Sequence, residues 1–189
     1  MAKKSDSATK QTKEGKAISS AKPGSKKSLK PTDEKAILEQ VIEQENRLVF
    51  PRFNHQIAYD LGFLLYTMAV ERKFPITIDI RKGSHVLYHV ALEGTTPNNE
   101  RWVVRKSNTV QLVHKSSYRI GLENRLGGTS LERRQFVSSL EYADHGGSFP
   151  IRVKDLGVIG AITVSGLAQE EDHQLVIEAL EQFLESLID

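Results

Sequence analysis

The feature that most constrains the fold is a hairpin signature in residues 148–164. Residues 148–153 form an extended stretch, residues 154–157 have the composition of a turn, and residues 158–164 are a short run rich in β-branched side chains. Such a run is too apolar to face water on both sides. The segment therefore predicts two neighbouring antiparallel strands, of which the second is buried.

A helix start follows this hairpin. Ser165-Gly166 ends the strand, and Glu170, Glu171 and Asp172 open the next helical segment. Carboxylates in a first turn suit the positive end of the helix dipole, and the orphan amides there can bind an anion or another polar ligand group. Consecutive helical residues point in different directions, so the three carboxylates cannot all face one reacting atom. Stabilisation of the helix start is the preferred interpretation, and no catalytic residue is assigned.

Extended patterns elsewhere raise the number of predicted strands to five. Ile76, Ile78 and Ile80 alternate with polar residues, and Lys82-Gly83 then turns the chain into a second extended stretch. The five predicted strands are residues 76–81, 86–92, 116–122, 148–153 and 158–164.

Helical periodicity and capping residues predict five helices. The first is short and follows Asp33, the second is capped by Asn54 and reaches Lys73, and the others span about 97–114, 131–140 and 169–188. Because tight hairpins join the strands, we expect an α/β fold of the α+β kind. Its antiparallel sheet is stacked with helices, unlike a doubly wound parallel sheet.

Charge divides the chain into two parts. Residues 1–31 hold nine lysines against Asp6 and Glu14, whereas the remainder has more acidic than basic residues. The basic stretch has too few apolar groups to offset its ordering entropy, so we predict a disordered tail at 1–31 and a single domain at 32–189. Nucleic-acid binding is not expected, since no aromatic or arginine residue is interleaved with the lysines.

Several classes of site and location are excluded or disfavoured. The chain has no cysteine, which excludes disulfides, thiolate metal ligands and a cysteine nucleophile. The Rossmann glycine fingerprint, the P-loop, the His-Glu-x-x-His pattern and the EF-hand loop are absent from the sequence. No run has the length of a membrane span and no signal-peptide pattern is present, so we expect a cytoplasmic protein without a membrane association.

Two strings of the sequence carry a family resemblance. They are Tyr-Ala-Asp-His-Gly-Gly at 142–147 and Ser-Gly-Leu-Ala-Gln-Glu-Glu-Asp-His at 165–173, with Pro150-Ile151 and Gly-Val-Ile-Gly-Ala-Ile at 157–162 between them. Together they resemble the GlcG/HbpS-like, or haem-degrading-domain, superfamily. The two longer strings are similar to an uncharacterised conserved branch found in bacteria and yeasts. The likeness spans about residues 48–188.

The resemblance implies a profilin-like three-layer fold with a five-stranded antiparallel sheet flanked by helices. It also implies a homo-oligomer. Some members resemble extracellular haem-binding sensors and others are linked to small-molecule metabolism without a settled activity. Unlike the sensors, this sequence shows no secretion signal. Haem is therefore a candidate cofactor on resemblance alone, and whether the protein is an enzyme stays open.

We expect a ligand pocket where residues 142–147 meet residues 165–173. Glycine-rich backbone, a helix N-terminus and two titratable rings can converge there on a polar or anionic group. The candidate ligand-binding residues are Ser117, His145, Gly146, Gly147, Ser165, Gly166, Asp172 and His173. A structural role is the alternative for the rings, with His145 bonded to a turn and His173 interacting with Asp172 or a neighbouring subunit.

No metal site is predicted. His85 and His89 lie four residues apart in a strand, hence on one face, but such a pair is more typical of a solvent-exposed sheet surface than of a metal site.

Two functions remain: an oligomeric small-ligand-binding protein, with haem the first ligand to test, or a non-enzymatic homo-oligomeric adaptor for protein partners.

Overall fold

The computed structural model describes residues 31–187, so the predicted basic tail lies outside the described residues except for Pro31. Ten elements follow one another: α1 (Pro31–Arg47), α2 (His55–Glu71), β1 (Thr77–Lys82), β2 (His85–Ala91), α3 (Pro97–Val113), α4 (Ser117–Leu126), α5 (Leu131–Gln135), β3 (Ser148–Val153), β4 (Gly157–Ser165) and α6 (Gln169–Ser186).

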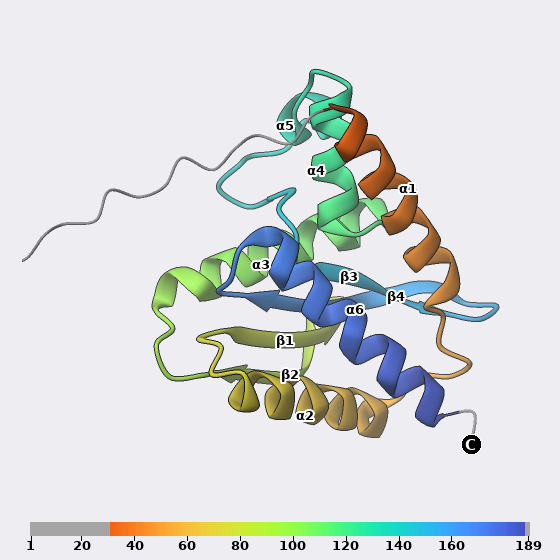
Figure 1. Cartoon of the computed structure of the whole chain (residues 1–189), viewed down its shortest axis with the longest axis vertical. Helices are drawn as coiled ribbons and strands as arrows, with labels where there is room; N and C mark the ends of the chain where they lie inside the picture. Colours follow the sequence, from red (N-terminus) through yellow and green to blue (C-terminus); the bar gives the residue numbers. More distant parts are fainter. Residues whose placement is uncertain (1–30, 188–189) are drawn as a thin grey trace, which may run out of the picture.

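The strands form one antiparallel sheet in the order β2-β1-β4-β3 (Figure 1). The predicted hairpin at 148–164 is confirmed as β3 and β4, with positive φ at Asp155 in the turn and at Gly157, the first residue of β4. β4 lies inside the sheet between β1 and β3, which accounts for its apolar sequence. The mixed α+β class with helices on an antiparallel sheet is therefore correct.

The two faces of the sheet differ in chemistry. Ile78, Ile80 and Ile162 are fully buried in the main core, which α2 and α6 cover. The alternate residues Thr77 and Thr163 are also fully buried, but they face the side on which α3 packs. Figure 1 shows α6 crossing the sheet on one side and α3 lying on the other. The polar layer beneath α3 provides the surroundings of the candidate site.

The prediction of a strand at 116–122 is wrong, because this segment is the helix α4. The Ser116 hydroxyl accepts a hydrogen bond from the Arg119 amide and caps the helix. Tyr118 and Leu122 lie one turn apart and pack together against Val41 of α1. The sheet consequently has four strands rather than five, and the profilin-like assignment stays a prediction.

The predicted helix at 131–140 is shorter than expected. α5 ends at Gln135, and Phe136 adopts a left-handed conformation with φ of 56°. The chain then runs as an irregular segment from Phe136 to Gly147 and brings His145 to α3 and α6. No helix within residues 31–187 is both long and apolar enough to cross a membrane.

Candidate functional site

A cavity of about 250 Å³ opens where α3, the segment before β3 and the β4–α6 turn meet. Helix α3 contributes Asn98, Asn99, Trp102 and Lys106 to its wall. The remaining wall comes from the two strings that carry the family resemblance, through His145, Gly146, Ser165, Gly166, Leu167, Gln169 and Asp172. The structure thus places a cavity at the predicted junction and adds α3 as its third side.

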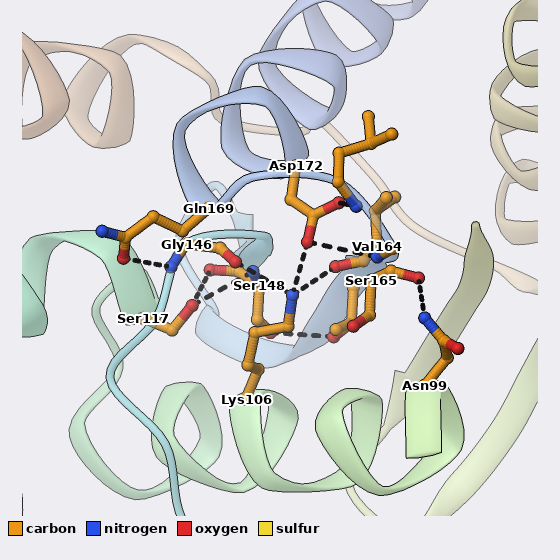
Figure 2. A network of polar contacts seen from close by, with 12 residues as sticks. Asn99, Lys106, Ser117, Gly146, Ser148, Val164, Ser165, Gln169 and Asp172 are labelled. Carbon is orange, nitrogen blue, oxygen red and sulfur yellow. Dashed lines mark hydrogen bonds and ion pairs between the residues drawn. The ribbon is translucent and has the colours of Figure 1, made fainter. Parts of the chain in front are cut away.

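Lys106 is the central polar group behind this cavity (Figure 2). Its side chain is only 3 % exposed. The Lys106 ammonium donates to the carbonyl oxygens of Gly146 at 2.9 Å and Val164 at 2.6 Å, and to Asp172 Oδ2 at 3.0 Å. An ammonium has three N–H donors, so every donor of Lys106 is used within the protein. These bonds join α3, the 142–147 segment, β4 and α6.

Asp172 is equally well satisfied. Besides Lys106 it accepts the backbone amides of Leu167 at 3.0 Å and Gly166 at 3.4 Å. Burial raises the pKa of Asp172 and lowers the pKa of Lys106, while the opposite charge of each partner acts against these shifts. The full set of hydrogen bonds favours the ionised pair. Neither residue therefore has a spare charge for a ligand.

His145 and Trp102 lie together in the cavity wall. The rings meet edge to face with their centroids 4.9 Å apart. Partial burial lowers the pKa of His145, and the Asp144 carboxylate opposes this effect. The His145 imidazole is consequently neutral near pH 7, with one nitrogen as donor and the other as acceptor. The guanidinium of Arg105 lies 4.4 Å from the centre of the Trp102 ring.

Glycine is required at both positions of the pair after His145. A side-chain carbon at Gly146 would collide with the carbonyl oxygen of Gln169. Gly147 has φ of 117°, and a side-chain carbon there would collide with the carbonyl oxygen of Val164. The pair therefore allows a close approach to the backbone, but the approaching groups are the protein's own, the Val164 carbonyl of β4 and the Gln169 carbonyl at the start of α6.

The amides before α6 are already occupied. The carboxylate of Asp172 binds the Gly166 and Leu167 amides, and the Glu171 carboxylate accepts the Ala168 amide at 3.2 Å. Asp172 and Glu171, two of the three first-turn carboxylates, therefore bind the backbone at their own helix start, in agreement with the preferred interpretation. They also occupy these three amides, so an anionic ligand gains no support from them.

His173 and Ser117 lie outside the cavity. His173 is buried, its Nε2 lies 3.0 Å from Gln44 Oε1, and its ring packs against Tyr118 and Phe149. Burial lowers its pKa to about 4. The Ser117 hydroxyl is bonded to the backbone of Ser148. The expected convergence of two histidine rings is therefore not found, because Asp172 and His173 are consecutive on α6 and point in different directions.

Sequence reasoning missed the α3 side of the cavity. Lys106 carried the detectable signal, because it shares a helical stripe with the buried residues Val103, Ser107 and Val110. A lysine on the buried face of a helix requires a partner. Trp102 lies one turn before Lys106 on the same side of the helix, and this spacing places it at the same site.

The two strand histidines have separate surroundings. His85 is exposed and its ring lies 5.5 Å from that of His55, measured between centroids. His89 lies between the carboxylates of Asp79, at 3.0 Å, and Glu100, at 3.1 Å. Within the described part of the chain, no group of three histidine or carboxylate residues is placed to hold a metal ion.

Comparison with known proteins agrees with the sequence resemblance. The family model described as haem degrading protein HbpS-like matches residues 53–181. The UPF0303 protein of Acidobacterium capsulatum is 49% identical over 140 residues, which cover 74% of this chain and 85% of that protein.

Solved structures share the fold. The crystal structure of the Ybr137w protein has 32% sequence identity and a TM-score of 0.75, and the match covers 82% of this chain and 94% of that one. A PduOC:heme complex has 14% identity and a TM-score of 0.58 over 68% of this chain and 93% of that chain, which shows likeness of fold alone. The chain belongs to the HbpS-like family of the GlcG/HbpS-like superfamily, with UPF0303 proteins among its relatives.

Proposed function

We propose that this protein binds a small, uncharged, hydrogen-bonding molecule in the cavity between α3, His145 and the start of α6. The observation that carries the proposal is that Trp102 and a neutral His145 line a cavity whose buried charges, Lys106 and Asp172, are already paired with each other. An apolar ring combined with a few polar groups is the usual composition of a small-molecule site.

The polar groups of the wall favour a neutral ligand. Asn98, Ser165 and Gln169 contribute amide and hydroxyl groups, which donate and accept hydrogen bonds without carrying charge. A bound carboxylate or phosphate would need an unpaired cation or free backbone amides to compensate its desolvation. Lys106 cannot serve, because its three donors are used, and the Arg105 guanidinium, which lies on the Trp102 ring, is not part of the cavity wall. A neutral molecule avoids that cost.

Haem does not fit the cavity as an enclosed ligand. A neutral His145 could serve as an axial donor. However, a volume of about 250 Å³ falls below the roughly 300–1,000 Å³ of pockets that enclose drug-sized ligands, and haem is larger than those. Its second expected ligand, His173, lies in the core against Tyr118. The haem-related names belong to the matched family and to the PduOC complex. They describe those proteins and do not assign haem to this chain.

Native mass spectrometry of the full chain, purified without added ligand, tests the proposal. We expect an additional small mass on each subunit, released on denaturation and lost in His145→Ala. The matched control is His55→Ala, because His55 is an exposed histidine at the start of α2. An absence of bound mass, together with no binding from a library of neutral fragments, would refute the proposal.

The alternative function, a non-enzymatic adaptor, is favoured by one observation. Phe136 is 94% exposed and Leu140 is 75% exposed in the segment after α5. Projecting apolar groups of this kind are frequent in protein-binding sites. An adaptor predicts that Phe136→Ser with Leu140→Ser abolishes capture of a purified partner and leaves cavity binding intact. Homo-oligomeric assembly and a cytoplasmic location stay predictions.

A further inference from the structure

The first turn of α3 is connected to the sheet by the side chains of Asn99, a residue of the cavity wall, and Glu100. Within residues 31–187, three polar side-chain contacts join this turn to the strands. Glu100 lies 3.1 Å from His89 Nε2 of β2 and accepts from the Thr77 hydroxyl of β1 at 3.5 Å. Asn99 donates to the Ser165 carbonyl at 3.4 Å (Figure 2). The contact with His89 is the shortest of the three.

His89 joins this turn to a buried carboxylate. Its register partner in β1 is Asp79, and directly opposed residues of an antiparallel pair share one face of the sheet, here the face on which α3 packs. His89 Nδ1 lies 3.0 Å from Asp79 Oδ2. The Asp79 side chain has no exposed surface, and the Arg81 guanidinium donates to both of its oxygens. The imidazole ring therefore bridges β1 and α3.

Both ring nitrogens of His89 must donate in this arrangement. Carboxylate oxygens only accept hydrogen bonds, whereas a neutral imidazole has one N–H and an imidazolium has two. The charged groups that face the ring in the described part of the chain are Asp79 and Arg81 of β1 and Glu100 of α3. Two carboxylates and one guanidinium leave one negative charge, which a proton on His89 balances. The geometry therefore fits the imidazolium form, and loss of the proton would turn a lone pair towards one carboxylate.

We propose that His89 is a proton-controlled positioning residue, which in its protonated form fixes the first turn of α3 and with it the Asn99 and Trp102 side of the cavity. When the proton leaves, the contact with Glu100 is lost first, because the buried Asp79 carboxylate costs more to leave unpaired. Histidine is the side chain that ordinarily changes charge between pH 5 and 8, so this turn responds to pH in that range. The consequence for ligand affinity rests on the proposed function.

Titration of neutral amide and hydroxyl fragments at pH 6 and pH 8, followed by Trp102 fluorescence, tests this consequence. The wild type should bind about threefold more tightly at pH 6, as expected for a partly exposed ion pair. His89→Gln should bind weakly at both pH values, and His89→Lys, which keeps its charge, should bind tightly at both. A merely structural role would weaken both variants. His85→Gln is the matched control and should keep the wild-type response, because His85 is exposed on the same strand and its ring lies against His55.

Nuclear magnetic resonance of the ligand-free protein tests the positioning itself. The chain has one tryptophan, so the Trp102 indole N–H gives a single signal. This signal should shift between pH 8 and pH 6 in the wild type and shift less in His89→Gln, and both ring nitrogens of His89 should carry protons at pH 6.

The two proposals fail in different ways. An identical Trp102 response in the wild type and in His89→Gln would overturn the role of His89, as would a fragment affinity with the same pH dependence in both proteins. A Trp102 response that depends on His89, without any fragment binding, would support the positioning and refute only the proposed function.

Discussion

Lys106 Nζ and Asp172 Oδ2 lie 3.0 Å apart, and both side chains are almost completely buried. The pair connects the middle of α3 to the first turn of α6, and Lys106 also binds the carbonyl groups of Gly146 and Val164. One ion pair therefore holds together the three segments that form the cavity.

Replacing Lys106 by methionine should destabilise the fold strongly. Lys106→Met leaves the Asp172 carboxylate buried without a cation, and removing one partner of a buried pair typically costs about 3–5 kcal/mol. The free energy of unfolding from urea denaturation measures this. Adding Asp172→Asn should recover part of the loss, because the remaining charge is removed and an amide oxygen still accepts the Leu167 amide.

An exposed ion pair provides the control for this experiment. Arg72 and Glu178 form a 2.7 Å contact with side chains 43% and 34% exposed. Arg72→Met should cost no more than about 1 kcal/mol. Equal losses for Lys106→Met and Arg72→Met would contradict the role given to the buried pair.

Stability should fall as the pH drops from about 6.5 towards 4, and His173 should account for much of this loss. Its pKa is lowered to about 4 in the folded chain, whereas an unfolded histidine titrates near its ordinary pKa of 6.5. The unfolded state therefore binds more protons between these values, so acid favours unfolding. The contribution of neutral His173 to the free energy of unfolding is fully present above pH 6.5 and is lost as the pH falls to about 4.

Comparison of the wild type with His173→Gln isolates this effect. Between pH 7 and pH 5 the wild type should lose about 2 kcal/mol more than the variant, as linkage predicts for such a shift. Denaturant unfolding at the two pH values measures the difference. The same pH dependence in both proteins would show that His173 does not titrate as its buried position requires.

Gly147→Ala should cost more than a substitution that only strains the backbone. Gly147 has a positive φ and a side-chain carbon there would also collide with the Val164 carbonyl. Gly83 is the matched control, since its φ of 57° is strained for alanine but nothing lies within 4 Å of the added carbon. Gly83→Ala should cost about 1–2 kcal/mol. A Gly147→Ala loss no larger than that would contradict the close approach of β4.

The sequence was sufficient to predict those elements whose structure depends on neighbouring residues in the chain. The β3–β4 hairpin follows from an extended stretch and a β-branched run on either side of a Lys-Asp-Leu-Gly turn, and these signals are local. The place of the cavity followed from the two family strings. Residues that sequence reasoning assigned to the cavity and that line it include His145, Gly146, Ser165, Gly166 and Asp172.

The sequence was insufficient to predict structure that depends on contacts between residues far apart in the chain. Residues 116–122 alternate well enough for a strand, but Glu45 of α1 accepts the Ser116 amide at 2.8 Å and binds Arg119, which favours the helix start. His173 was assigned to the cavity because it belongs to a family string. Its actual partner, Gln44, is 129 residues away along the chain, and no local pattern reports such a contact.

Fluorescence of Trp102 tests the central claim most directly, because this residue is the only tryptophan of the chain and lies in the cavity wall. Neutral fragments with amide and hydroxyl groups, and matched carboxylates, would be titrated into the wild type and into His145→Ala. We predict a saturable change in emission with neutral fragments, weaker binding of the carboxylates, and at least tenfold weaker binding of the neutral fragments to His145→Ala. Saturable binding that prefers carboxylates, or that is unchanged in His145→Ala, would contradict this account.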